Sequence, residues 1–467
     1  MESFDFKGFW WLPNNSSERL AGICRFTSFE GGELEIIGNS DYLIEFNIVN
    51  QPFIILGTTV KNGDITLYDC FLRKKEKGNG VFLYYVYVNL IFLGHHFYND
   101  SNVKFNKISI HYSFINEWVN NQTFDFVQSE NAEEHIVNKR GEQLAQASID
   151  NNYSLSIHIN YGKSVSLFEK ITIDRKVFIT IDSSQERHYK DYIKIMSYTR
   201  NFLTLAITKP VFPLIMNGFI SKDGVISVVR ILGKLSSPAN DILASKLSWH
   251  EMFFTFHDIS DKFELFIKNW FEKAKDMGTV YELYFGVLDN PNSYYPQQDI
   301  LSLIQSLESY CQKDINSELK KFERSEDEHS KILEDIMNQV PEYHQKWLER
   351  KLINSNNLSL NGKIMSLLKS QSFQEIIKHL NKQENAFNIF LDGKSKNDFV
   401  NEIVKIRNTL SHGSGYDGDV YGKNFRLQIQ RLKVLVEILL LKELGFDKET
   451  IGTIILRSEA RLNIKDN

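Results

Sequence analysis

The sequence Phe263-Glu-Leu-Phe-Ile-Lys-Asn-Trp-Phe271 marks the point where the chain changes from strand-forming to helix-forming patterns. Its apolar residues recur with the spacing of one face of an α-helix, at Phe263, Phe266, Ile267, Trp270 and Phe271. We therefore predict an α+β fold class. A β-rich N-terminal domain, residues 1–258, is expected to precede a helical C-terminal region, residues 259–467.

The region before this stretch carries patterns typical of strands. Runs rich in β-branched and aromatic residues are bounded by Gly and Asn at residues 42–48, 53–56, 65–71 and 177–181. Turn sequences at residues 61–64 and 77–80 separate neighbouring runs. These patterns predict antiparallel hairpins in a sandwich or a barrel-like domain. A helical insertion is expected at residues 185–205.

The region after it carries patterns typical of helices. A loop at residues 289–296 precedes a helix predicted at residues 299–311, and no proline follows Pro341. The last long helix is predicted at residues 424–444, with an apolar stripe and an end at Gly445. We expect it to pack against the helix that carries the motif described next.

The stretch Lys405-Ile-Arg-Asn-Thr-Leu-Ser-His-Gly413 places three candidate catalytic residues, Arg407, Asn408 and His412, at the end of a predicted helix. Arginine stays charged and offers a planar fork of donors that suits phosphate oxygens. Histidine exchanges protons near neutral pH. Such a pair can promote attack of a 2′-hydroxyl on the neighbouring phosphorus without a metal ion. The substrate must then be RNA, because DNA lacks this hydroxyl.

Coincidence is the alternative explanation of this spacing, since the chain contains 12 histidines. The sequence Arg324-Ser-Glu-Asp-Glu-His329 has the same Arg-x4-His spacing, but its three carboxylates would repel a phosphate. We interpret that match as a solvated helix face. The match at residues 407–412 has Asn after the arginine, no acid inside it and Gly-Ser-Gly directly after it, which favours a functional role.

Helical geometry limits how these side chains can cooperate. Phe399, Ile403, Ile406 and Leu410 share one face, which predicts that the motif lies on the opposite, polar side. Arg407 and His412 fall about 140° apart on a regular helix. Either the helix unwinds at His412, next to Gly413 and Gly415, or two chains share one cleft.

The motif resembles the active-site signature of the HEPN superfamily, whose members are often metal-independent ribonucleases that work as dimers. Two further stretches, Phe6-Lys-Gly-Phe-Trp-Trp-Leu-Pro13 and Gly32-Glu-Leu-Glu-Ile-Ile-Gly38, resemble the N-terminal domain of the ApeA family of bacterial antiphage proteins. Residues 303–310, 406–412 and 441–445 are similar to the HEPN domain of that family, with its core at about 297–447. Ile406 is a departure, because a small polar residue often precedes the arginine.

The resemblance implies an antiphage effector that acts by abortive infection. Its HEPN domain would cleave RNA, with tRNA as the expected target, and would form a homodimer. Its N-terminal domain would respond to a phage-derived trigger or restrain the nuclease. Glu308, on the first HEPN helix, could orient His412 or hold Arg407, or could be a structural carboxylate.

Composition sets outer bounds on these expectations. The net charge of −5 argues against a broadly basic nucleic-acid coat. Cys24, Cys70 and Cys311 are expected to be buried thiols, and the histidines lack metal-site spacing, so no metal and no cofactor are predicted. No signal peptide or membrane span is recognised, because the longest apolar run covers only residues 81–93. We expect a cytoplasmic protein.

Two rival functions stay open at this stage. One is a catalytically inactive HEPN-type protein that binds RNA or only dimerises, with an N-terminal domain that senses a ligand. The other is a lectin-like or phage-protein-binding activity of the β-rich region. Trp10 and Trp11 could form a ligand platform there, but adjacent strand residues point to opposite faces, so one of them is expected in the core.

Overall fold

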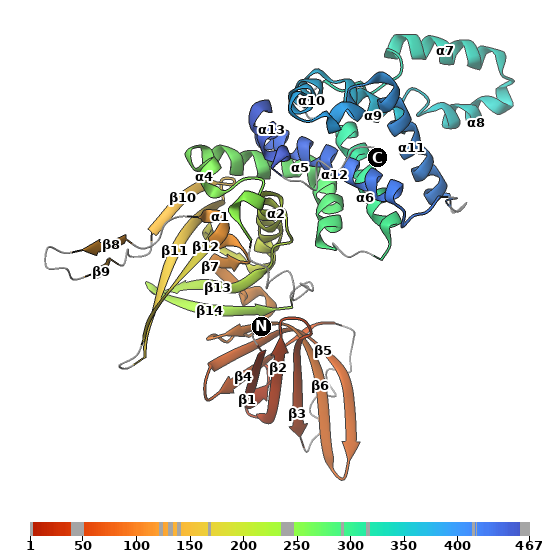
Figure 1. Cartoon of the computed structure of the whole chain (residues 1–467). Coiled ribbons are helices and arrows are strands. Elements are labelled where there is room, and N and C mark those ends of the chain that lie inside the picture. The colour runs from red at the N-terminus through yellow and green to blue at the C-terminus, as the bar shows by residue number, and fades with distance from the viewer. Residues whose placement is uncertain are drawn as a thin grey trace. The chain divides into compact units, whose positions relative to one another are not determined.

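The structure is a computed structural model that divides the chain into two compact units, Met1–Lys268 and Asn269–Asn467 (Figure 1). It describes residues 3–38, 51–120, 125–128, 134–137, 142–166, 170–234, 247–290, 294–313, 318–412, 416 and 418–457. The named strands all lie in the first unit, and the second is built from helices. The predicted fold class, α+β with a β-rich N-terminal part and a helical C-terminal part, is confirmed.

Six antiparallel strands of the first unit close into a barrel (Figure 1). They are β1 (Ser3–Trp11), β2 (Leu20–Thr27), β3 (Gly31–Gly38), β4 (Phe53–Thr59), β5 (Gly63–Gly78) and β6 (Val81–Leu93). Their order is β6-β3-β2-β1-β4-β5, and pairing of β5 with β6 closes the ring. The two predicted turns join β4 to β5 and β5 to β6. The strand run predicted at residues 42–48 lies outside the described residues.

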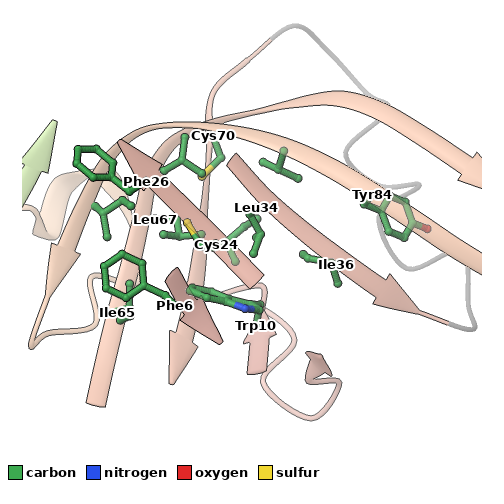
Figure 2. Packing of buried hydrophobic residues seen from close by; sticks show 14 of the residues in the cluster. Phe6, Trp10, Cys24, Phe26, Leu34, Ile36, Ile65, Leu67, Cys70 and Tyr84 are labelled. Atoms are coloured by element: carbon green, nitrogen blue, oxygen red, sulfur yellow. The ribbon is translucent and has the colours of Figure 1, made fainter. Parts of the chain in front are cut away.

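The barrel interior is filled by alternate side chains of its strands, as the two-residue period of a strand requires. In β6, Phe82, Tyr84, Val86 and Val88 point inward and are buried. They belong to one apolar cluster with aromatic, aliphatic and cysteine side chains of the other strands, part of which Figure 2 shows around Trp10 and Cys24. Cys24, Cys70 and, in the second unit, Cys311 are free and buried, as predicted.

The two adjacent tryptophans of β1 lie on opposite faces of the strand, and both are buried. Trp10 belongs to the barrel core (Figure 2), which confirms that one of the pair is a core residue. Trp11 is covered on the outside by Arg19, whose guanidinium carbon lies 4.2 Å from the ring centroid, and by the edge of His96. Neither indole is therefore an open platform for a ligand.

Gly57 on β4 pairs with Trp10 and leaves no room for a side chain. A Cβ atom at Gly57 would lie 2.2 Å from Cε3 of Trp10. We expect Gly57→Ala to lower the stability of this unit by about 1–3 kcal/mol, because the indole must move within a packed core. Hydrogen exchange of the barrel strands measures the free energy of opening of this unit and so reports the loss of stability. Gly78→Ala, where a Cβ meets nothing within 4 Å, is the control; equal protection in both variants would contradict the packing described here.

The barrel continues into an open antiparallel sheet through the pairing of β6 with β14 (Val225–Gly233). The sheet runs on through β13 (Pro213–Lys222), β7 (Lys104–Tyr112), β12 (Lys170–His188), β11 (Tyr153–Ser166) and β10 (Glu142–Ser148). The predicted helical insertion is α2 (Tyr189–Ile207), which contacts β7 and β12. Its Tyr192 hydroxyl donates to the carbonyl of Phe105 on β7 at 2.8 Å. A separate hairpin pairs β8 (Asp125–Gln128) with β9 (Glu134–Val137).

Smaller helices complete the first unit. They are η2 (Asp100–Asn102), α1 (Ile115–Val119), η3 (Trp249–Glu251), α4 (Phe256–Ile259) and η4 (Ser260–Lys262). The stretch that begins at Phe263 forms α5 (Phe263–Asp289), as its periodicity predicts. The division between the two units falls within this helix.

The second unit is a helical bundle with a projecting pair of helices (Figure 1). Its remaining elements are α6 (Pro296–Lys313), α7 (Glu326–Gln339), α8 (Glu342–Leu352), α9 (Leu360–Lys369), α10 (Gln371–Gln383), η5 (Asn385–Phe390), α11 (Gly393–Ser411), α12 (Lys423–Leu444) and α13 (Lys448–Leu456). Neither α7 nor α8 contains a buried residue. Within the described part of the chain, no helix has the length and apolar character needed to cross a membrane.

The central helix of this unit is α12, which ends at Gly445 in a left-handed conformation with φ 106°, as the sequence predicts. From residue 431 to 444 it is buried almost all round, not only on a stripe. Its buried acids accept hydrogen bonds from tyrosines: the hydroxyls of Tyr284 and Tyr310 donate to Glu437 and Glu443, each at 2.8 Å. Glu443 also pairs with Lys273 at 2.6 Å. Its closest helix neighbours are α6 and α13; the motif helix α11, which the sequence predicts as its packing partner, is not among its main contacts.

Candidate active site

The motif lies on α11, whose start and buried face follow from its sequence. Asp392 caps the helix, because its side chain accepts a hydrogen bond from the backbone of Ser395 at 2.8 Å. Phe399, Ile403 and Ile406 are buried, and α11 packs against α6, α9 and η5. Leu410, expected on the same face, is only half-buried at the end of the helix. The buried face fixes α11 and leaves its other side open.

The three predicted site residues lie on that open side, at the end of α11. Arg407 is half-buried, whereas Asn408 and His412 are exposed. A guanidinium nitrogen of Arg407, Nη1, donates to Oδ1 of Asn408 at 3.3 Å. Asn408 therefore contacts the arginine through its side chain. All three residues are thus at least partly exposed to solvent, and the guanidinium of Arg407 is held by its neighbour.

The backbone of α11 stays helical up to the histidine. The helix extends to Ser411, and the N–H of His412 still donates to the carbonyl of Asn408 at 3.1 Å. His412 itself is the C-cap residue of α11, with φ −91° and ψ 0°. Arg407 and His412 are thus about 140° and 7.5 Å apart along a continuous helix. Gly413 and Gly415 lie outside the described residues.

The segment after the motif is tied back to α11 by a tyrosine that the sequence reasoning did not identify. The Tyr416 hydroxyl donates to Oε1 of Glu402 on α11 at 3.1 Å. Burial, together with this hydrogen bond, raises the pKa of Tyr416. The ring also packs on Phe425 of α12, and a Cβ at Gly418 would lie 2.4 Å from it. The only signal in the sequence is an aromatic residue within a glycine-rich segment.

Two other candidates from the sequence have different partners. Glu308 on α6 accepts a hydrogen bond from Nζ of Lys363 on α9 at 2.8 Å, which gives this acid a structural ion pair between helices. Arg324 precedes α7, where it lies 3.6 Å from Glu323, and His329 shares a hydrogen bond with Ser355 at 3.2 Å. The Arg-x4-His match at residues 324–329 therefore extends across the start of α7.

The helical bundle that carries the motif follows a β-rich N-terminal region, and each of these parts matches a known protein family. Residues 301–450 match the family described as Apea-like HEPN. Residues 5–270, more than half of the chain, match ApeA N-terminal domain 1. The chain belongs to the ApeA family. Membership indicates a function related to RNA cleavage or to antiphage defence. No curated protein and no solved structure matches it.

Proposed function

We propose that this chain is a metal-independent endoribonuclease that cleaves RNA by attack of a 2′-hydroxyl on the adjacent phosphodiester. The observation that carries this proposal is the open placement of Arg407 and His412 at the end of α11 in a HEPN-family domain. Both side-chain types suit the reaction, and neither is enclosed in the core. Their exposure is consistent with access by a long polymer such as RNA.

The chemistry assigns one role to each residue. A bond forms between the 2′-oxygen and phosphorus, and the bond from phosphorus to the 5′-oxygen breaks. Arg407 stabilises the charge on the crowded phosphorane, where donors aimed at developing charge are most effective. His412 accepts the proton of the 2′-hydroxyl while water protonates the leaving 5′-oxygen, or it protonates the leaving 5′-oxygen while water accepts the proton of the 2′-hydroxyl. Asn408, hydrogen-bonded to Arg407, positions the guanidinium. The products carry a 2′,3′-cyclic phosphate and a 5′-hydroxyl.

The regular helix supports a cleft shared by two chains. Because α11 does not unwind before His412, one chain cannot easily direct both side chains at the same phosphate. A twofold axis beside the end of α11 would bring Arg407 of one chain opposite His412 of the other. The proposed active form is therefore a homodimer through the HEPN domain.

Family membership supports a role in antiphage defence by abortive infection. In this proposal the target is tRNA in the cytoplasm, and a phage-derived trigger acts on the N-terminal unit. Expression of the chain with and without phage infection tests both parts. Fragmented tRNA in infected cells only would support them; intact tRNA together with continued growth of infected cells would reject them.

The metal-free mechanism makes a direct prediction. Cleavage of RNA by the purified chain should change less than twofold when EDTA is added or Mg²⁺ is omitted, because the proton transfers and the charge stabilisation come from side chains. Gel analysis of a labelled RNA measures the rate. Activity that disappears with EDTA and returns with Mg²⁺ would reject this mechanism.

A catalytically inactive scaffold is the second candidate, and one observation favours it: each chain alone separates Arg407 from His412 on a continuous helix. This candidate predicts intact cellular RNA after expression, whether or not the motif is mutated. RNA fragments that depend on Arg407 would exclude it.

A further inference from the structure

A cavity of about 620 Å³ opens in the first unit beside the start of β4 and the end of β1. This volume lies within the range typical of small-molecule sites. One part of its wall is apolar and includes Leu12, Pro13, Pro52 and Phe53. Tyr98, a residue that is 55% exposed, also lines the cavity. Such a wall can cover the apolar part of a ligand.

The other part of the wall is a prearranged polar group of three side chains, Tyr68, Asp100 and Lys190. The Tyr68 hydroxyl donates to Oδ1 of Asp100, and Nζ of Lys190 donates to the same atom at 3.1 Å. Burial, reinforced by the bond to Asp100, raises the pKa of Tyr68 to about 12. The hydrogen bond from Tyr68 lowers the pKa of Asp100, so the carboxylate stays charged. The lysine and Asp100 therefore neutralise each other.

Asp69 is the remaining charged residue of the cavity wall. It lies at a β-bulge, where Tyr68 and Asp69 of β5 face the single residue Ile54 of β4. Its φ of 53° is left-handed, a conformation that Asp and Asn adopt more readily than most residues. Bulges often re-aim a side chain beside a binding site.

The Asp69 carboxylate has no hydrogen bond and no ion pair with another residue in the described ranges, although it is half-buried. Partial burial raises its pKa; the charge of Asp100 adds to this effect, and the charge of Lys190 opposes it without outweighing the burial. Two carboxylates and one ammonium give the wall a formal charge of 1 − 2 = −1. An anionic ligand would meet this excess of negative charge, whereas a cation would compensate it.

We propose that this cavity binds an ammonium or guanidinium group carried on an apolar stem. The cationic group pairs with Asp69, and the stem packs against Phe53, Pro52 and Tyr98. Aromatic side chains at the margin add a favourable contact for a cation. The cationic group can belong to a free amine or to a basic side chain of a polypeptide. The experiment distinguishes these two sources. This inference concerns the first unit alone and is independent of the proposed nuclease activity.

Ligand-observed NMR titration of the full-length chain tests the proposal with tryptamine, agmatine and the capped tripeptide acetyl-Leu-Arg-Leu-amide. At least one of the three should bind, and the neutral and anionic analogues N-acetyltryptamine and indole-3-propionate should bind at least tenfold more weakly. Tighter binding of the tripeptide identifies a polypeptide as the source, and tighter binding of a free amine identifies a small molecule.

Asp69→Asn is the decisive variant, because Asn keeps the shape of the side chain and tolerates the same backbone conformation. We expect it to weaken binding of the cation at least tenfold. Asp174→Asn, on the exposed surface of β12, is the matched control and should bind as the wild type does. Failure of all three cations to bind would overturn the proposal, as would equal affinity of the Asp69→Asn variant and the wild type.

Discussion

Alanine at Arg407 or at His412 should lower the rate of RNA cleavage by about 10³-fold or more while the protein stays folded. Each substitution removes a group that acts on the transition state, and losses of about 10²–10⁴-fold are typical of such groups. Both side chains lie outside the core, so the helical unit should keep its stability. Cleavage of a labelled tRNA by purified variants measures the rate, and circular dichroism confirms the fold.

The chain offers matched controls for this experiment. Arg324→Ala and His329→Ala change the second Arg-x4-His match in the same unit, and both variants should cleave RNA at the wild-type rate. Arg407→Lys keeps the charge but loses the planar fork, so we expect an intermediate rate. Wild-type rates for both Arg407→Ala and His412→Ala would reject the assigned roles.

Co-expression of the Arg407→Ala and His412→Ala chains should restore cleavage that neither variant has alone. If each functional pair joins Arg407 of one chain to His412 of the other, a mixed dimer keeps one of its two pairs intact. Random pairing makes half of the dimers mixed, so the mixture should show about one quarter of the wild-type activity. The large gain over either variant alone makes this test sensitive.

The same mixture distinguishes the two possible geometries of the site. When both residues must come from one chain, every pair in a mixed dimer is broken and the mixture stays inactive. Differently tagged chains, purified in tandem, isolate the mixed dimer and remove the dependence on random pairing. An inactive, tandem-purified mixed dimer would contradict the shared cleft proposed from the continuous α11.

Much of the helical unit could be predicted because its signals are local. Five apolar residues of Phe263–Phe271 recur at helical spacing and begin α5, and Gly445 ends α12 in a conformation that favours glycine. The packing partners of α12 are harder to predict from the sequence. The helix is buried almost all round from residue 431 to 444, but its most apolar residues alone form a stripe. Which helices lie closest to it depends on tertiary packing, which no local pattern describes.

Most strand pairings of the barrel, in contrast, cannot be predicted from local sequence patterns. The β5–β6 hairpin follows from the turn sequence at residues 77–80, because short turns leave a recognisable signature. The pairings β3–β6 and β1–β4 join strands that are far apart in sequence and have no such signature. The closed ring and its extension into an open sheet therefore came only from the structure.

The candidate site likewise has residues that the sequence predicts and residues that only the structure shows. Residue types and spacing led to Arg407, Asn408 and His412, and helical periodicity placed them away from the buried face. The anchor from Tyr416 to Glu402 spans a turn that no periodic pattern describes. The cavity wall gathers Asp69, Asp100 and Lys190 from three elements, so that only the folded chain brings their charges together.

The central claim is that Arg407 and His412 act on one ribose linkage without a metal ion. Mapping of RNA ends after expression of the wild-type and Arg407→Ala chains tests it most directly. We predict new 2′,3′-cyclic phosphate and 5′-hydroxyl ends in the wild type and none in the variant. New ends that carry a 5′-phosphate and a 3′-hydroxyl, or equal numbers of new ends in both strains, would contradict the claim.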